Sequence, residues 1–297
     1  MRVVISGATG LIGTALCATL SDAGHDVVRL VRRNATANDI LWDPARRSMP
    51  AGALSGADAV VHLAGAGIGD RRWSDSYRRE ILESRTASTS MLADAIATTE
   101  DGPRVFLSGS AIGYYGATGD EQLDESSPAG SGFLADVCVQ WEAAAAPAVQ
   151  AGARVAFLRT GIVLSPAGGA LKKLLPLFTI GAGGRFGSGR QWQSWISLPD
   201  EVGAIVHLLT TEVSGPVNLT APSPLTNAEF TKVLASVMRR PALLPVPRIG
   251  PALLLGGDLA DALLYTGQRV MPGVLSRSGY QFQHPTLEVA LRALLGR

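Results

Sequence analysis

Three glycines near the N-terminus are spaced to bind an anionic ligand. They stand at positions 7, 10 and 13, directly after an apolar run, and a helical pattern follows them. In such a strand, turn and helix, the first glycine allows a tight turn, the second lets backbone N–H groups approach a pyrophosphate, and the third permits close helix packing. The helix N-terminus then faces the anion. An ordinary turn is the alternative, but the flanking pattern favours a dinucleotide site formed by Gly7, Thr9, Gly10, Leu11, Ile12 and Gly13.

Two arginines indicate which dinucleotide this site would take. The second expected strand, residues 26–31, is followed by Arg32 and Arg33, where an NAD site usually has an Asp or Glu for the ribose 2′-OH. A guanidinium can form two hydrogen bonds to a 2′-phosphate and keeps its charge, whereas a carboxylate would repel that phosphate. We therefore predict NADP(H) as the cofactor. The alternative is that both arginines belong to a solvated loop.

A further arginine lies on the apolar face of the helix expected over residues 74–99. Arg85 follows Ile81 by four residues and therefore shares its face. A buried guanidinium needs a partner. We expect that partner to be a cofactor phosphate or a carboxylate of a neighbouring helix, with Glu80 close enough to orient the site. A structural ion pair at the helix edge is an equally weighted alternative.

Alternating strands and helices must position these residues. The expected strands after the first are 26–31, 58–64, 104–108 and 154–159, and the longer helices are 74–99 and 132–151. Right-handed crossovers between such strands give a doubly wound parallel sheet. We predict an α/β fold of the Rossmann type, with an NADP-binding domain over residues 1–164. A smaller mixed α/β region on the substrate side follows over residues 165–297, parts of which return to the sheet near residues 195–219.

Ligands of doubly wound sheets bind at the carboxyl ends of the strands. The glycine turn, Arg32, residues 63–67 and residues 108–113 each follow an expected strand. These four segments should therefore converge on one site. Within residues 63–67, Gly65 is expected to lie at the cofactor.

A second glycine-rich segment, residues 181–195, has the composition of a substrate lid. It carries Arg185, Arg190, Trp192 and Trp195 among its glycines. Glycines permit movement, arginines can bind an anionic group, and indoles offer flat apolar surface with one hydrogen-bond donor. We predict that Arg185, Arg190 and Trp192 contact the substrate. An irregular surface loop is the alternative.

Composition limits the classes of partner. The 297 residues are 46% hydrophobic and 17% charged, and 26 Lys and Arg face 25 Asp and Glu, so no global basic field recruits nucleic acid or anionic lipid. A small-molecule substrate fits better. Cys17 and Cys138 form neither a zinc nor a redox spacing, and no apolar run approaches the ~20 residues that span a bilayer. The N-terminus enters the first strand directly. We expect a cytoplasmic protein without a metal or a membrane partner.

Several motifs together resemble a known family. The glycine segment, His62-Leu-Ala-Gly65, Ser108-Gly-Ser110 and Tyr114-Tyr115-Gly116 resemble extended short-chain dehydrogenases/reductases of the nucleoside-diphosphate-sugar epimerase type. Arg72-Trp73, Phe133-Leu134-Ala135, Arg159-Thr-Gly161 and Gly187-Ser-Gly-Arg-Gln191 look like the SDR39U1-like branch of epimerase family proteins, and residues from about 251 to 297 resemble its C-terminal domain of unknown function.

The resemblance implies NADP(H) binding by the matching positions, and it implies a dimer surface. These cofactor positions are Arg32, Leu63, Ala64, Glu80 and Arg85. Helices 74–99 and 132–151 are the surfaces that commonly form a four-helix homodimer interface in the resembled family.

One departure bears on catalysis. Catalytic members of the superfamily use a tyrosine followed four residues later by a lysine, which lowers the phenol pKa. Leu134 and Cys138 stand at those positions here, and no tyrosine of the chain has a lysine four residues on. We expect the Cys138 thiol to be inert, because an aliphatic neighbourhood raises the pKa of a thiol.

Two functional hypotheses follow from this departure. In the first, the protein is an NADP(H)-dependent oxidoreductase or epimerase in which Tyr114 or Tyr115, after Ser108 and Ser110, supplies the phenol. In the second, it is a non-catalytic NADP(H)-binding sensor. An arginine-lined second surface has little use in a sensor, which favours the enzyme.

Overall fold

The central element is a parallel sheet of seven strands, in the order β11-β7-β5-β4-β1-β2-β3. The computed structural model describes residues 1–242 and 244–297. The strands are β1 (Arg2–Ser6), β2 (Asp26–Val31), β3 (Asp39–Leu41), β4 (Ala59–His62), β5 (Val105–Ala111), β7 (Arg154–Thr160) and β11 (Gly215–Leu219). The strand order reverses at β1, which pairs with β2 on one side and with β4 on the other. A crevice therefore forms above the carboxyl ends of β1 and β4.

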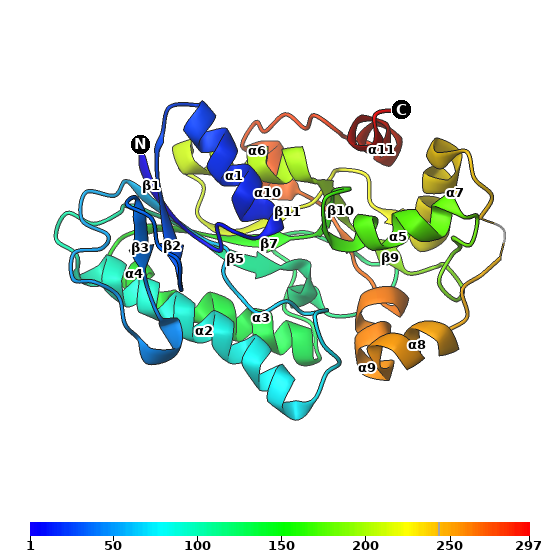
Figure 1. Cartoon of the computed structure of the whole chain (residues 1–297), viewed down its shortest axis with the longest axis horizontal. Coiled ribbons are helices and arrows are strands. Elements are labelled where there is room, and N and C mark those ends of the chain that lie inside the picture. The colour runs from blue at the N-terminus through cyan, green and yellow to red at the C-terminus, as the bar shows by residue number, and fades with distance from the viewer. Residues whose placement is uncertain (243) are drawn as a thin grey trace.

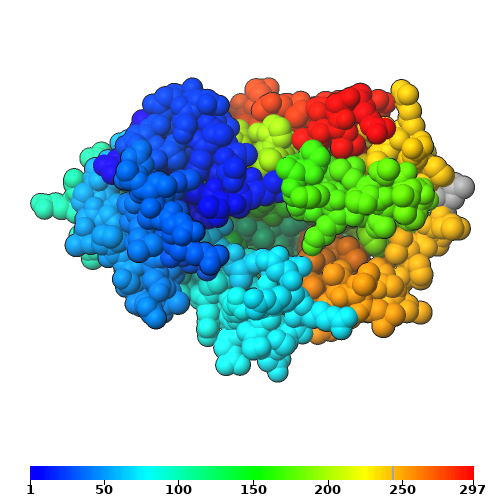
Figure 2. Space-filling model, viewed as in Figure 1, coloured from blue at the N-terminus to red at the C-terminus, as the bar shows by residue number. Residues whose placement is uncertain are grey.

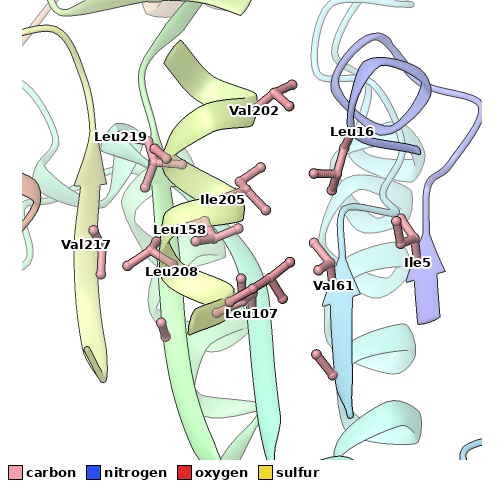
Figure 3. Packing of buried hydrophobic residues seen from close by; sticks show 14 of the residues in the cluster. Ile5, Leu16, Val61, Leu107, Leu158, Val202, Ile205, Leu208, Val217 and Leu219 are labelled. Carbon is pink, nitrogen blue, oxygen red and sulfur yellow. The ribbon is translucent and has the colours of Figure 1, made fainter. Parts of the chain in front are cut away.

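Helices cover both faces of this sheet (Figure 1). One face carries α1 (Leu11–Asp22), α6 (Leu198–Thr210) and α10 (Gly273–Arg277), and the other carries α2 (Asp75–Thr98), α3 (Phe133–Ala143) and α4 (Ala146–Gln150). Figure 3 shows the core on the α1 side, where Ile5, Val61 and Leu107 of the strands pack against helix residues. Full burial of each such side chain contributes about 1.5–3 kcal/mol. This core fixes the strand ends that carry the site.

A smaller region lies beyond the end of the sheet. Its helices are α5 (Gly169–Thr179), α7 (Asn227–Met238), α8 (Ile249–Leu255), α9 (Gly257–Ala260) and α11 (Leu287–Leu295). Short strands join the region to the sheet domain, as the pairs β8 (Ile162–Leu164) with β10 (Trp195–Ser197), β9 (Trp192–Gln193) with β12 (Leu225–Thr226), and β6 (Gln122–Leu123) with β13 (Arg269–Val270). Single-turn helices complete the chain at η1 (Pro44–Arg46), η2 (Ile112–Tyr115) and η3 (Asp261–Tyr265). Trp195, Phe178 and Leu234 are buried in the core of this smaller region.

The predicted doubly wound parallel sheet is confirmed, and its first long helix, α2, begins and ends within one residue of the prediction. The helix predicted over 132–151 is wrong, because the chain forms α3 and α4 with a break between them. Pro147 explains the break, since its ring lacks an N–H and clashes with the carbonyl group four residues earlier, at Ala143, where α3 ends. Leu243 lies outside the described residues. Within the described chain, no helix combines the length and apolar character that crossing a membrane requires.

Candidate functional site

The glycine turn connects β1 to α1. At two of its three glycines, Gly7 and Gly13, a side chain would clash with the protein itself. Gly7 has φ +71°, and a Cβ there would lie 2.6 Å from the carbonyl carbon of Leu63. A Cβ at Gly13 would lie 2.2 Å from the carbonyl oxygen of Gly7. Gly10 is different, because its Cβ would meet only that same oxygen, at 3.3 Å, and its own φ is an ordinary −78°. The space above Gly10 is thus left open by the protein.

A cavity of about 280 Å³ opens at this turn. It is lined by Gly7, Gly10, Leu11, Ile12, Gly13, Leu63, Ile162, Val163, Gly169 and Ala170. No side chain caps the N-terminus of α1, and the first turn has no acidic residue. The N–H groups and partial positive charge of the helix are therefore left for a ligand, and they fit a pyrophosphate. Thr9 is exposed beside the turn.

Figure 2 shows a hollow in the surface here, bordered by the blue N-terminal residues, the green residues around α5, the cyan start of α2 and the orange α8–α9 segment. An ion pair between Arg78 and Asp258, 2.5 Å apart, joins α2 to α9. Arg72 also donates hydrogen bonds to the carbonyl groups of Leu253 and Leu254 in α8. The hollow therefore has the sheet domain on one side and the smaller region on the other.

The end of β2 offers uncompensated positive charge. Arg32 and Arg33 are exposed there, and neither forms an ion pair with any described residue. The nearby carboxylate of Asp39 is occupied by Arg29, whose Nε lies 2.7 Å away and whose hydrogen bonds lower the pKa of Asp39 to about 2. No free carboxylate among the described residues of this strand end would repel a 2′-phosphate. The arrangement fits NADP(H) as predicted.

Arg85 is buried on α2 and forms no ion pair with any described residue. Its Nη1 donates to the carbonyl oxygen of Ile81 at 3.0 Å, and its guanidinium lies 5.0 Å from the ring centroid of Trp141. A Cβ at Gly65 would lie 3.2 Å from this guanidinium, so the cation reaches the segment that follows β4. The alternative of a structural ion pair is wrong. Burial lowers the pKa of Arg85, and a bound anion would offset that cost.

Glu80 lies elsewhere. It is exposed on α2 and faces Arg71, with 3.6 Å between its Oε2 and the arginine Nη1, and it has no hydrogen bond to Arg85. Leu63 and Ala64 do follow β4 at the turn, where Leu63 donates a backbone hydrogen bond to Ser6 at 3.2 Å. The segments after β1 and β4 therefore converge as predicted, without Glu80 in contact with them.

A neutral histidine supports the segments that follow β1 and β4 beside the cavity. His62, the last residue of β4, is fully buried, with Nδ1 2.5 Å from the Ser6 hydroxyl and Nε2 3.0 Å from that of Ser88. Burial, together with the charge of Arg85, lowers the pKa of His62 to about 3. The uncharged ring ties β1, β4 and α2 together beside the cavity. The histidine inside the otherwise apolar run 59–64 was the available signal for this role.

Two of the four hydroxyl groups predicted for catalysis, those of Ser110 and Tyr115, belong to a buried network. Glu142 accepts hydrogen bonds from Arg159 at 2.8 and 2.9 Å and from the Ser110 hydroxyl at 2.7 Å. Ser108 is fully buried two residues earlier on β5. Sequence reasoning missed the pairing of Glu142 with Arg159, because those residues come from α3 and β7 and meet only in the fold. Both serines thus face the protein interior.

The two adjacent tyrosines differ in environment. Tyr115 is fully buried, and its hydroxyl donates to Asn218 at 2.7 Å and accepts from Arg159 at 3.0 Å. Burial raises the pKa of Tyr115, which further argues against it as a proton donor to a ligand. Tyr114 is partly exposed, with the guanidinium of Arg159 3.5 Å from its ring centroid. Of the two phenols, only that of Tyr114 can meet a ligand.

The face of α3 that meets this segment is apolar. A Cβ at Gly113 would lie 3.4 Å from Cβ of Leu134 and 3.8 Å from Sγ of Cys138. The Cys138 thiol donates to the carbonyl oxygen of Ala111 at 3.6 Å. Burial, with the Glu142 charge second, raises the pKa of Cys138 to about 11, as the predicted inert thiol requires.

The predicted lid over residues 181–195 is instead bound tightly to the smaller region. The backbone N–H of Val246 donates to Arg185, that of Ala228 donates to Gly189, and that of Asn227 donates to Gln191, at 2.8–2.9 Å. The Trp195 ring is fully buried, with its Nε1 donating to the carbonyl of Ser223. Trp195 is therefore a core residue rather than part of a substrate surface.

The remaining predicted substrate residues stay near the surface. Arg185 and Arg190 are exposed. The Trp192 ring lies 4.6 Å from the Arg269 guanidinium, and its Nε1 donates to Asp120 at 2.8 Å. The indole is thus held by protein groups on two sides.

Comparison with known proteins agrees with this geometry. A model of the NAD dependent epimerase/dehydratase family matches residues 3–220, and a domain of unknown function, DUF1731, matches residues 246–294. The chain belongs to the NAD dependent epimerase/dehydratase family. An epimerase family protein of Mycobacterium tuberculosis is 47% identical over 291 residues, which cover 97% of this chain and 96% of that protein. Human epimerase family protein SDR39U1 is 36% identical over 99% of this chain and 100% of its own length.

Solved structures of family members extend this result. The crystal structure of human SDR39U1 with NADPH has a TM-score of 0.91 and 35% identity, covering 100% of both chains. A nucleoside-diphosphate sugar epimerase from Corynebacterium glutamicum has a TM-score of 0.83 and 38% identity, covering 100% of this chain and 58% of that one. The predicted SDR39U1-like branch and its C-terminal domain are confirmed, and the NADPH of the human protein agrees with the predicted cofactor.

Proposed function

We propose that this family member binds NADPH and catalyses hydride transfer between the cofactor and a small molecule in the adjoining hollow. The observation that carries the proposal is the cavity at Gly10, where an uncapped helix N-terminus stands open. An ordinary turn would have its N–H groups capped by side chains or covered. The NADPH in human SDR39U1 supports the choice of cofactor.

The chain's residues divide the binding between them. The N-terminus of α1 would hold the pyrophosphate, and Arg32, with Arg33 beside it, would bind the 2′-phosphate. Arg85 would place a cation beside Gly65, and neutral His62 would keep the segments after β1 and β4 rigid. NADPH, when bound, supplies a hydride. If the substrate takes a proton from the protein, Tyr114 is the group placed to give it, because Tyr115 is enclosed.

A second candidate function is NADP(H)-dependent regulation without turnover. Leu134 and Cys138 favour it, because neither can act as the acid and cation that the usual tyrosine and lysine provide. The exposed Arg185 and Arg190 and the hollow between the two regions favour the enzyme. We therefore place the oxidoreductase first.

The two free cysteines support a reducing compartment such as the cytoplasm. This proposal can be tested by locating the tagged chain in fractionated cells. Recovery with an oxidising compartment would contradict it.

Turnover tests the proposed function directly. NADPH binding is first established by quenching of protein fluorescence, and NADPH oxidation is then followed with a panel of carbonyl compounds and sugar nucleotides. We expect binding together with oxidation for at least one compound, and neither in Gly10→Val. Tight NADPH binding with no oxidation by any compound class would instead support the regulatory function.

A further inference from the structure

The most exposed apolar side chains of the molecule all lie in the smaller region. Ile180, Leu244, Ile249, Leu253 and Leu254 are 69–80% exposed, whereas the next large hydrophobic side chain among the described residues is 53% exposed. A single exposed leucine is ordinary on a protein surface, but a group of exposed apolar side chains marks a site of interaction. The surface that carries these five residues therefore needs a partner.

Backbone contacts bring the first two of these residues together. Ile180 follows α5 and precedes Gly181, where a Cβ would lie 3.6 Å from the ring of Pro241. A Cβ at Gly184 would meet the carbonyl oxygen of Leu244. The end of α5 thus lies against the segment that contains Pro241 and Leu244.

The other three residues lie on α8, which begins five residues after Leu244. Ile249 and Leu253 are four residues apart and share one face of this helix, and Leu254 is adjacent to that face. Figure 1 shows α5, α7 and α8 at the same end of the molecule, opposite β3. We call the surface that carries the five exposed side chains the apolar end.

Cations without acidic partners accompany the apolar end. Residues 165–199 and 230–257, which supply α5, most of α7 and α8, contain eight Lys and Arg and no Asp or Glu. Lys173 on α5 is exposed, as are Arg239 and Arg240 directly after α7. None of these three side chains forms an ion pair with a described residue. Their charge is therefore available to an anionic partner.

The two regions of the chain differ in charge. Residues 165–297 carry 12 Lys and Arg against 7 Asp and Glu, whereas residues 1–164 carry 14 against 18. The balanced charge of the whole chain, from which no membrane partner was expected, therefore conceals a basic region and an acidic sheet domain. Exposed charges act over about 10 Å at 0.1 M salt, so the local distribution decides what a surface attracts.

A lipid surface fits this combination better than a protein partner. A partner helix lays its apolar face into a groove, but the side chains of the apolar end project with most of their surface exposed. The interface of a bilayer accepts projecting apolar side chains, and its anionic headgroups attract Lys and Arg. We propose that the apolar end docks on an anionic lipid surface, with the acidic sheet domain turned away from it. The cytoplasmic leaflet carries such lipids, which agrees with the proposed compartment.

Cosedimentation with vesicles tests the docking. The full chain is mixed with vesicles of phosphatidylcholine alone or with about 30% phosphatidylglycerol, at low salt and at about 0.5 M salt. We expect an apparent affinity at least about 10-fold higher for the anionic vesicles at low salt, and a loss of most of that difference at the higher salt, because salt screens exposed charges. Equal binding to both kinds of vesicle, or no sedimentation with the anionic ones, would overturn the proposal.

Serine substitutions test the apolar contribution. Leu244→Ser with Leu253→Ser should lower the affinity for anionic vesicles at least about 10-fold, because the variant transfers less apolar area from water to lipid. Leu41→Ser with Val149→Ser is the matched control, since these two side chains are also exposed but lie on β3 and α4 of the sheet domain. The control should change the affinity less than about 2-fold. Circular dichroism checks that both variants are folded.

Charge reversal tests the basic contribution. Arg239→Glu with Arg240→Glu should lower the affinity for anionic vesicles at least about 10-fold and leave binding to neutral vesicles unchanged. Arg46→Glu with Arg104→Glu changes the net charge equally at exposed positions of the sheet domain, and it should have less than about a 3-fold effect. Equal losses in the two variants would mean that only the net charge of the chain matters, against the proposal.

Two further results would assign the apolar end to another role. A dimer that Leu244→Ser with Leu253→Ser dissociates, with no vesicle binding, would mean that a second copy of the chain covers this surface. Vesicle binding that every variant keeps would mean that another surface meets the lipid. Either result overturns the proposal, and neither bears on NADPH oxidation, which is measured separately.

Discussion

Two glycine-rich segments of this chain look alike in composition and differ in what approaches their backbone. At residues 7–13 the protein leaves α1 uncapped and leaves space above Gly10. At residues 181–195 the protein itself fills the space, since a Cβ at Gly184 would lie 1.9 Å from the Leu244 carbonyl oxygen. Neighbouring backbone groups of the second segment are bonded to Val246 and Ala228. Glycine content therefore signals close approach, and the hydrogen-bond partners tell whether a ligand or the protein makes that approach.

The largest expected effect comes from filling the open space of the first segment. Gly10→Val should lower NADPH affinity at least about 100-fold, equivalent to about 2.7 kcal/mol, because the side chain would occupy the place of the pyrophosphate. The fold should persist, since a Cβ there meets only the Gly7 oxygen at 3.3 Å. Fluorescence titration and circular dichroism measure the two quantities. Normal NADPH binding by the variant would show that residues 7–13 are not the anion site.

The next largest effect concerns the 2′-phosphate. Arg32→Ala should weaken NADPH binding by about 1.5–3 kcal/mol while NADH binding changes little, because only NADPH carries the phosphate that the guanidinium can bind. Arg104→Ala is a control, because Arg104 is also exposed but precedes β5, away from the carboxyl ends of the strands. Parallel titrations of both cofactors give the answer. An Arg32→Ala protein that keeps its preference would show that another cation recognises the phosphate.

A side chain added in the second segment should lower stability and leave NADPH affinity unchanged, the opposite of Gly10→Val. Gly184→Ala should lower the free energy of unfolding by about 1–3 kcal/mol, the usual cost of overpacking, because the Leu244 carbonyl must move. NADPH affinity of the folded fraction should stay within a factor of about two. Urea unfolding and cofactor titration are measured on one preparation. Lost NADPH affinity at unchanged stability would mean that this segment also contacts the cofactor.

The sequence predicted the sheet and the first segment because both depend on local patterns. Apolar runs followed by a polar residue recur in β1, β4 and β5, and parallel crossovers leave few ways to arrange them. The contacts of residues 181–195 could not be predicted in that way. Their partners lie at residues 227–228 and 246, and no local pattern marks which backbone groups will meet across the fold.

The candidate catalytic residues show the same limit. Ser110 and Tyr115 were predicted from their position after the strand expected over residues 104–108. The strand β5 instead continues to Ala111, so Ser110 lies within it and only Tyr115 follows it. Their hydroxyl groups nevertheless point into a network with Glu142 and Asn218, which come from α3 and β11. A hydroxyl near a strand end can face either the ligand or the interior. Only the fold decides which.

The last effect is expected in the pH dependence of the free energy of unfolding, at the buried carboxyl group of Glu201. Glu201 is fully buried in the first turn of α6, and its Oε1 accepts a hydrogen bond from Thr160 of β7 at 2.9 Å. Its Oε2 is buried without a partner among the described residues. Burial, opposed by that hydrogen bond, raises the pKa of Glu201 from 4.5 to about 8.

The sign of the pH dependence follows from that direction. Below pH 4.5 the carboxyl is protonated in both the folded and the unfolded protein, so its contribution is fully present. As the pH rises toward about 8, only the unfolded chain ionises, and stability is lost at up to about 1.4 kcal/mol per pH unit. Glu201→Gln should remove this pH dependence of stability and keep the hydrogen bond to Thr160. Glu83→Gln, at an exposed position, should leave the pH dependence unchanged. Urea unfolding at about pH 5 and 8 measures both, and equal slopes in Glu201→Gln and the wild type would mean that Glu201 is ionised in the folded protein.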